Sequence, residues 1–284
     1  MSGAQSFRIV FVLPHENNIP IGGYKVVYEY ANALVARGHQ AAVVLPKQMH
    51  ARTGFAGEIK NQIWPILHRR RNPGVVTWFK LDPRVQIVLC SDLREKWLPD
   101  ADFVFATSWR TAPFVADYPA RLGRKMYLIQ HLEIFDGDYG DVIATWKLPL
   151  HKVVISKWLR DLATSIGEQT SYVPNGINFE EFRLEKPIEG RKPRVMGLFH
   201  KDFVKGSYDG LNALELAKER FPDLSAVFFG MPSVRGDIPS WIEYVKGPLA
   251  PQLREMYNGS SIFLHPSWSE GGHTTRKARP RWER

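Results

Sequence analysis

Residues 7–46 read FRIVFVLPHENNIPIGGYKVVYEYANALVARGHQAAVVLP, and they decide the fold. The stretch opens with a continuous apolar run, which is typical of a parallel strand buried on both faces. A loop follows, and residues 24–38 then have helical periodicity, with Gly38 in the position that commonly ends a helix. The residues expected on the buried face of that helix are Val26, Val27, Tyr30, Ala31 and Leu34. A second apolar run at 41–46 completes a strand–helix–strand crossover and predicts a parallel α/β sheet.

The same alternation continues along the first part of the chain. Further strands are expected at residues 85–90, 102–108, 125–130 and 151–157. Ser156 is a candidate N-cap for the helix that follows the last of them. A turn-rich passage, SYVPNGINFEEF, and the polar stretch EKPIEGRKP then interrupt the pattern. We therefore predict a first, Rossmann-like domain over residues 1–178.

The pattern restarts beyond this boundary and predicts a second doubly wound domain over residues 179–270. Its expected strands are 194–199, 224–230, 241–247 and 260–266, and its expected helices are 207–223 and 251–259. Open sheets of this class usually have about five or six strands, so the second domain is predicted to be incomplete. Residues 271–284 have no apolar period and carry five Lys/Arg against one Glu, which favours a disordered basic tail.

Composition and motifs narrow the function classes. The chain is 44% hydrophobic and 24% charged, which is typical of a globular protein. Its single cysteine, Cys90, ends an apolar run and is expected to be a buried thiol in a reducing compartment. The chain lacks a P-loop, a GxSxG elbow and metal-ligand spacing, so no metal or cofactor is expected.

Charge and hydropathy indicate where the protein works. The net charge is +9, but residues 181–270 are balanced, with 12 basic and 12 acidic side chains. No nucleic-acid partner is therefore expected. The N-terminus lacks the features of a signal peptide, and no apolar run approaches the ~20 residues of a membrane span. These features predict a cytoplasmic protein, and HRRR at 68–71 is a candidate for peripheral contact with the inner face of the membrane.

Several candidate site residues follow strands, where doubly wound sheets bind their ligands. Gly22 and Gly23 precede a helix and suit a phosphate, although Gly-Gly also suits a tight turn. His131 follows the strand at 125–130 and can bind or orient a substrate, or it can be structural. In the second domain His200, Lys201 and Lys205 follow the first strand and suit a diphosphate, while Glu270 follows the fourth.

Four segments together resemble the GT-B glycosyltransferases, in particular glycosyltransferase family 4. They are IPIGGYKVVYEYANALVARGHQAAVVLP, VVISKWLRDLA with SYVPNGINFEEF, FHKDFVKGSYDGLNALELAKERFPDLSAVFFG, and LREMYNGSSIFLHPSWSEG. The resemblance covers nearly all of residues 7–271. It implies a retaining, metal-free hexosyltransferase that moves a sugar from a nucleotide sugar to a hydroxyl of a glycan or lipid-linked acceptor, for example in bacterial surface polysaccharide assembly.

The resemblance also implies roles for individual residues. Gly23 would approach the donor phosphates or the acceptor, and His131 would lie near the transferred sugar. Lys205 matches the lysine of the family's Arg-x4-Lys-Gly diphosphate clamp, and His200 stands where the arginine is usual. The segment 245–247, which contains Lys246, falls where the family holds the nucleobase.

The match ends within the family's Glu-x7-Glu motif. Glu270 matches the first acid, which contacts the donor sugar, and Gly271 follows it, but Ala278 stands at the position of the second acid. The resemblance therefore implies an incomplete donor site and little transferase activity from residues 1–284 alone. The alternative is a non-catalytic binding or scaffold module derived from a glycosyltransferase.

Overall fold

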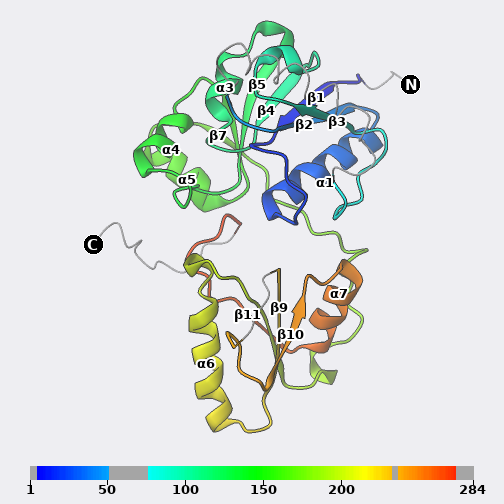
Figure 1. The fold of residues 1–284 in the computed structure, drawn as a ribbon, viewed down its shortest axis with the longest axis vertical. Helices are drawn as coiled ribbons and strands as arrows, with labels where there is room; N and C mark the ends of the chain where they lie inside the picture. The colour runs from blue at the N-terminus through cyan, green and yellow to red at the C-terminus, as the bar shows by residue number, and fades with distance from the viewer. Residues whose placement is uncertain (1–4, 51–75, 232–235, 273–284) are drawn as a thin grey trace. The chain divides into compact units, whose positions relative to one another are not determined.

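The computed structural model describes residues 5–50, 76–231 and 236–272. The chain divides into two compact units, Met1–Asn175 and Gly176–Arg284 (Figure 1). The boundary predicted from the sequence follows residue 178. The candidate membrane contact at 68–71 and nearly all of the predicted tail, from residue 273 onward, lie outside the described residues.

The first unit is built on a parallel sheet of seven strands in the order β3-β2-β1-β4-β5-β6-β7. Its strands are β1 (Arg8–Val12), β2 (Gln40–Pro46), β3 (Gln86–Cys90), β4 (Phe103–Ala106), β5 (Arg124–Ile129), β6 (His151–Val154) and β7 (Thr170–Tyr172). Within the described residues of this unit, the α-helices are α1 (Gly22–Ala36), α3 (Ala112–Asp117), α4 (Tyr139–Trp146) and α5 (Lys157–Ser165). The short 3₁₀ helices η2 (Glu95–Trp97) and η3 (Ala120–Leu122) lie in connections between strands.

Strand β1 lies between β2 and β4 because its apolar run can be buried on both sides. Val10 is paired with Ala42 of β2 and with Val104 of β4, and all three side chains are buried. Cys90 at the end of β3 is also fully buried, as its apolar context predicts. Burial raises the pKa of its thiol well above the ordinary value, so the thiolate is disfavoured.

The buried face of α1 differs slightly from the one expected. The residues that it buries are Tyr24, Val27, Tyr28, Ala31 and Val35. Val26, Tyr30 and Leu34 are only partly buried, and the ring of Tyr28 packs against those of Trp78 and Phe79, at centroid distances of 5.6 and 5.5 Å. Ser156 does occupy the N-cap position of α5, but its hydroxyl makes no capping hydrogen bond within the described part of the chain.

The second unit has a parallel sheet in the order β10-β9-β8-β11. Its strands are β8 (Arg194–Leu198), β9 (Ser225–Gly230), β10 (Ile242–Lys246) and β11 (Ile262–Leu264). Its helices are α6 (Ser207–Arg220) and α7 (Ala250–Gly259), together with the 3₁₀ helices η4 (Ile188–Gly190) and η5 (Phe203–Lys205). All four strands match those predicted, and β11 is an edge strand of the described sheet.

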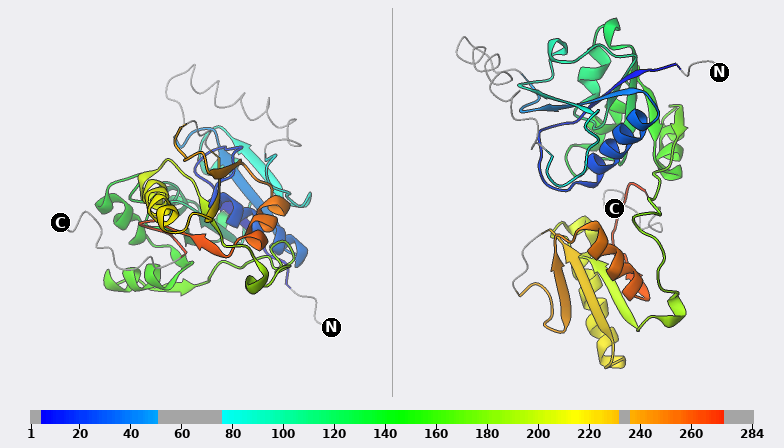
Figure 2. Two further views of the ribbon diagram at one scale, coloured as in Figure 1. Left: turned by 90° about the horizontal axis from the view of Figure 1, so that it is seen from below. Right: turned by 90° about the vertical axis from the view of Figure 1, so that its right-hand side faces the viewer.

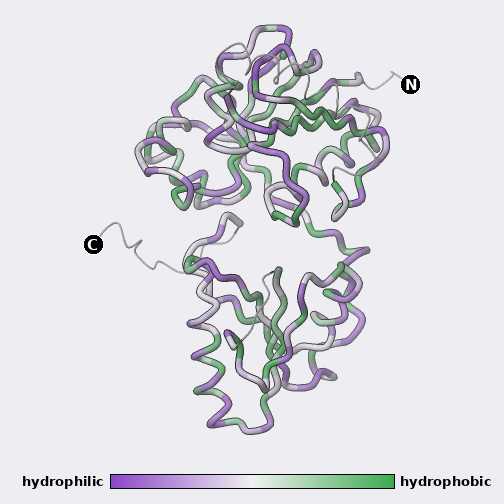
Figure 3. The backbone as a smooth tube through the Cα atoms, in the orientation of Figure 1, coloured by the Kyte–Doolittle hydropathy of each residue, from purple (hydrophilic) through white to green (hydrophobic). Residues whose placement is uncertain are grey.

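Helices α6 and α7 cover opposite faces of this sheet (Figures 1 and 2). Leu211 and Leu214 of α6 pack on one face, against a cluster that contains Phe228. Met256 of α7 packs on the other face, against Met196. Figure 3 shows hydrophobic and hydrophilic positions alternating along α6, as expected for a helix with one buried side.

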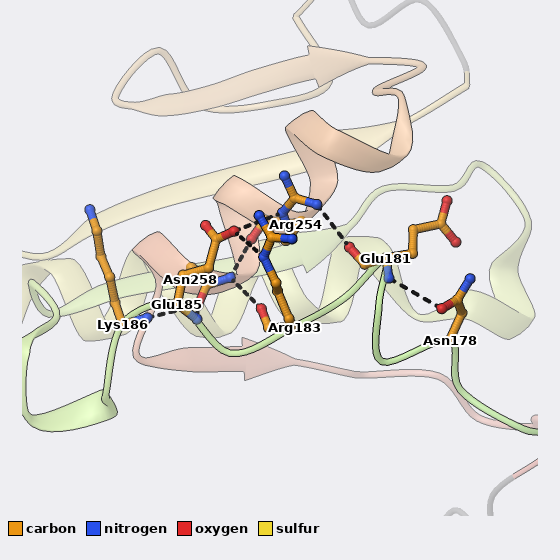
Figure 4. A network of polar contacts seen from close by, with 7 residues as sticks. All are labelled: Asn178, Glu181, Arg183, Glu185, Lys186, Arg254 and Asn258. Carbon is orange, nitrogen blue, oxygen red and sulfur yellow. Dashed lines mark hydrogen bonds and ion pairs between the residues drawn. The ribbon is translucent and has the colours of Figure 1, made fainter.

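The segment that opens the second unit is fastened to α7 by a buried amide (Figure 4). Asn258 Oδ1 accepts hydrogen bonds from the backbone N–H groups of Glu185 (2.7 Å) and Lys186 (3.1 Å). Its Nδ2 donates to the backbone carbonyls of Arg183 and Arg254, both at 3.1 Å. All the hydrogen-bonding capacity expected of one buried amide is therefore used, which fixes residues 183–186 against the helix.

Both sheets reverse their strand order once, and each reversal defines a candidate ligand position. In the first unit the loops after β1 and β4 leave adjacent strands in opposite directions. In the second unit the same holds for the loops after β8 and β11. Among the described residues, no helix is both long and apolar enough to cross a membrane.

Candidate functional site

The centre of the second unit's site is an ion pair between two loops. Lys205 ends η5 after β8, and Glu270 lies in the loop after β11. Lys205 Nζ donates to Glu270 Oε1 at 2.9 Å, with side chains that are 29% and 21% exposed. Because β8 and β11 are neighbours in the sheet, residues far apart in sequence meet at one strand edge. The structure thus brings together two of the residues predicted from the sequence.

The charges around Glu270 keep its carboxyl group ionised. Burial alone would raise the pKa of Glu270, but the Lys205 ammonium and the Ser267 hydroxyl bind the carboxylate and hold its pKa below the ordinary value. His265 lies nearby, with Nε2 at 3.4 Å from Glu270 Oε1. The sequence reasoning missed His265, although its position immediately after β11 was a signal. The site therefore presents a carboxylate and an ammonium side by side.

Backbone contacts hold these two loops together. Gly206 has a φ of +59°, and a Cβ at this position would lie 2.2 Å from the carbonyl oxygen of Pro266. Only glycine combines this conformation with this approach. The backbone N–H of Trp268 donates to Val204 O at 2.8 Å. The loop after β11 therefore packs directly against the turn that carries Lys205.

A stacked aromatic pair lies next to the ion pair along both loops. The rings of Phe203 and Trp268 are 6.1 Å apart and inclined by 14°. Their residues are 64% and 50% exposed, and Trp268 Nε1 donates to Asp209 Oδ2 at 2.8 Å. Exposed aromatic faces beside charged groups are common features of ligand sites. The sequence analysis did not single out either ring.

The remaining basic residues predicted in this unit lie differently. His200 is exposed, and its Nδ1 accepts from the backbone N–H of Asp202 at 3.0 Å, so the neutral ring carries its proton on Nε2. The neutral ring of His200 can therefore donate a hydrogen bond through Nε2. Lys201 is 3.4 Å from the carboxylate of Asp237. It does not form the pair with Glu270.

Lys246 and Gly271 mark the two ends of the strand edge. Lys246 is the last residue of β10, which is separated from β11 by two strands, or by about 14 Å at the usual spacing. Gly271 is buried next to Glu270. The structure therefore does not bring Lys246 to the ion pair. A ligand that reached both would have to extend along the edge of the sheet.

In the first unit, the predicted glycines open α1. Neither Gly22 nor Gly23 has a positive φ, so the pair is not needed for a tight turn. A Cβ at Gly23 would lie 3.3 Å from Nε2 of Gln130, which donates to Gly23 O at 3.1 Å. The absence of a side chain at Gly23 thus leaves room for the side chain of Gln130, which precedes His131. The N-cap residue Ile21 supplies no side-chain hydrogen bond to the first turn.

His131 lies partly buried between two aromatic rings. Its ring centroid is 5.6 Å from that of Phe135 and 6.0 Å from that of Trp158, both in edge-on geometry. Its Nδ1 is 2.8 Å from the carbonyl oxygen of Leu132, which can only accept a hydrogen bond. The proton is therefore on Nδ1, and in the neutral ring Nε2 is an acceptor.

Charged side chains from neighbouring loops surround this histidine loop. Arg110 follows β4, and its Nη2 is 2.7 Å from Asp136 Oδ1 in the loop after β5. Glu133 of that same loop accepts from the backbone N–H of Trp109 at 2.7 Å. Burial, followed by the charge of Arg110, lowers the pKa of His15 in the loop after β1. The loops after β1, β4 and β5 therefore form one polar cluster.

Polar clusters of this kind can bind metal ions when their ligands converge. Within the described residues, no group of three or more His, Cys, Asp or Glu side chains is arranged to hold a metal ion.

Comparisons with known proteins complete this description. No protein-family model matches the chain. The chain is 23% identical over 248 residues to a phosphatidyl-myo-inositol mannosyltransferase of Mycobacterium tuberculosis (strain CDC 1551 / Oshkosh), across 78% of this chain and 60% of the relative. The chain thus spans less than two thirds of the length of the curated relatives that it matches.

Solved structures share the fold at low sequence identity. A mutant of TarM from S. aureus, in complex with fondaparinux, alpha-GlcNAc-glycerol and UDP, has a TM-score of 0.64 at 11% identity, over 93% of this chain and 82% of that one. The catalytic domain of starch synthase IV from Arabidopsis thaliana, bound to ADP and acarbose, has a TM-score of 0.57 at 12% identity, over 94% and 79%. With two Rossmann-like α/β units and these neighbours, the chain has the GT-B fold of glycosyltransferases.

Proposed function

We propose that this chain is part of a glycosyltransferase that moves a sugar from a nucleotide-sugar donor to an acceptor hydroxyl. The observation that carries the proposal is the Lys205–Glu270 pair at the strand-order reversal of the second unit. It combines a cation suited to a diphosphate with a carboxylate suited to sugar hydroxyls. The similarity to a mannosyltransferase and the UDP and ADP bound in two structural neighbours support it.

In this proposal the second unit binds the donor. The diphosphate lies against Lys205 and the amino-terminal end of α6, whose positive end favours an anion. As the glycosidic bond breaks, these groups stabilise the charge that develops on the leaving diphosphate without a metal ion. Glu270 accepts hydrogen bonds from the sugar, and Nε2–H of His200 donates to a phosphate. The nucleoside extends toward Lys246 at the far edge of the sheet.

The first unit takes the acceptor side. His131 Nε2 accepts a hydrogen bond from a substrate hydroxyl, because its Nδ1 proton is committed to Leu132. The first turn of α1, opened by Gly22 and Gly23, contributes backbone N–H groups. The further proposal is a retaining hexosyl transfer to a glycan or a lipid-linked acceptor in bacterial polysaccharide assembly. The name of the mannosyltransferase relative supports the lipid-linked option.

Calorimetric titration of the purified chain with UDP, GDP and ADP tests the donor site. Lys205→Ala is expected to weaken binding of the preferred nucleotide by roughly tenfold to a hundredfold, because a charge-assisted hydrogen bond is lost. Lys201→Ala is the matched control, since Lys201 pairs with Asp237 rather than with Glu270. Equal losses in both variants, or no binding of any of the three nucleotides, would refute the assignment.

A further inference from the structure

Glu133 connects two loops of the first unit that the sheet alone does not join. It lies in the loop after β5, and its Oε2 accepts the backbone N–H of Trp109, in the turn after β4, at 2.7 Å. The turn carries Arg110, and the loop carries His131. The partner of Glu133 is a backbone amide, which does not transfer its proton. The hydrogen bond therefore serves to fix the position of the turn.

A second contact shows how closely the turn and the loop fit. A Cβ at Gly137 would lie 2.5 Å from the Trp109 ring, so the ring packs against the backbone of the loop after β5. The Arg110–Asp136 ion pair also bridges the two segments, but both side chains are about 45% exposed. Exposed pairs contribute little, so the partly buried carboxyl group of Glu133 is the stronger link.

We propose that Glu133 is a positioning residue for the acceptor side of the site, which holds Trp109 and Arg110 against the loop that carries His131. This inference rests on the proposed function for its consequence in catalysis. The contact between the two loops is present in the chain itself and does not depend on any substrate.

The environment of Glu133 makes this junction sensitive to pH. Burial raises the pKa of Glu133 to about 7, against the hydrogen bonds from Trp109 N–H and the Ser108 hydroxyl. Among the charged groups that face it, Asp136 also raises that pKa and Arg110 lowers it, and the buried phenol of Tyr127 adjoins the carboxyl group. Because burial disfavours the ionised form, an opening that hydrates the carboxyl group becomes easier as the pH rises through neutrality, and the junction loosens.

Hydrogen exchange at the Trp109 amide tests the junction directly, with no ligand present. Glu133→Ala is expected to lower the protection of this amide at least tenfold, because its acceptor is removed. Glu133→Gln keeps a carbonyl acceptor, so protection is retained, but it no longer changes between about pH 6 and about pH 8 after correction for intrinsic exchange. Asp138→Ala is the control, because Asp138 is an exposed acid whose side chain makes no capping bond to α4.

A kinetic readout then tests the consequence in the proposed reaction. With this chain and phosphatidyl-myo-inositol as the acceptor probe, Glu133→Ala is expected to raise the KM for the acceptor at least fivefold, with unchanged affinity for the nucleotide. If no nucleotide binds, the proposed function fails, while the exchange experiment still decides the junction. Unchanged Trp109 protection in folded Glu133→Ala overturns the inference. If Glu133→Ala does not fold, the inference is overturned when the protection of the Trp109 amide in Glu133→Gln still changes between about pH 6 and about pH 8.

Discussion

Replacing Gly206 by alanine tests how the second unit's site is built. Gly206 joins η5 to α6 with a φ of +59°, and an added Cβ would lie 2.2 Å from Pro266 O and 2.9 Å from Pro266 C. The left-handed conformation costs a non-glycine residue about 1–2 kcal/mol. The contact is with backbone, which cannot rotate away, and overpacking of this kind costs about 1–3 kcal/mol. We expect Gly206→Ala to lower the free energy of unfolding of this unit by about 2–5 kcal/mol.

Two other glycines of the same unit separate these contributions. Gly247 has a φ of +56°, and a Cβ there would meet only Met231 Sδ at 3.7 Å, so Gly247→Ala carries the conformational cost alone, about 1–2 kcal/mol. Gly259 ends α7 without a positive φ, and nothing lies within 4 Å of an added Cβ. Gly259→Ala is expected to be neutral or to stabilise by up to about 1 kcal/mol.

Hydrogen exchange of α6 peptides, followed by mass spectrometry as a function of urea, measures this unit separately from the first. Weaker binding of the nucleotide that the donor-site proposal requires should accompany the loss of stability in Gly206→Ala, because the displaced Pro266 carries the loop of Glu270 away from Lys205. The order Gly206, then Gly247, then Gly259 is the expected ranking of cost. A Gly206→Ala variant as stable as Gly259→Ala, with unchanged nucleotide binding, would refute the reasoning.

Two further predictions concern stability. Asn258→Ala should destabilise the second unit by about 2–4 kcal/mol in urea unfolding, because backbone groups are left without their buried partner, whereas Asn178→Ala, at an exposed site, should cost less than about 1 kcal/mol. For Glu133, the folded pKa of about 7 lies above the ordinary value of 4.5, so its contribution to stability is full below about pH 4.5 and is lost as the pH rises through 7. Glu133→Gln should therefore gain stability relative to the natural chain between about pH 5 and about pH 8, by at most about 3 kcal/mol, and an unchanged difference in urea midpoints would contradict the raised pKa.

Much of the fold follows from local sequence. The apolar runs at residues 7–14 and 41–46 are too continuous for strands exposed on one face, so they predict a buried parallel sheet. The position of polar residues in the loops that follow such runs nominated Lys205 and Glu270. The strand-end rule works because parallel strands all end at one edge, whatever lies between them in the chain.

Finer details of the elements were less predictable. The buried face of α1 is shifted toward Tyr24 and Tyr28, and Tyr28 packs against Trp78 and Phe79, which are distant in the sequence. The N-cap of α5 was also predicted only in part. Ser156 stands where an N-cap is expected, but its hydroxyl makes no capping hydrogen bond within the described residues.

The sequence by itself determined two α/β units, every strand except β7 (Thr170–Tyr172), and the loops that carry the candidate residues. Only the tertiary structure decided which side chains meet: Lys205 with Glu270, and Glu133 with the amide of Trp109. It also decided that Lys201 turns to Asp237. The physical reason is that these contacts join different loops, whose separation is set by the order and register of neighbouring strands. Local periodicity reports which residues are buried, but it does not give the order in which strands such as β8 and β11 become neighbours in the sheet.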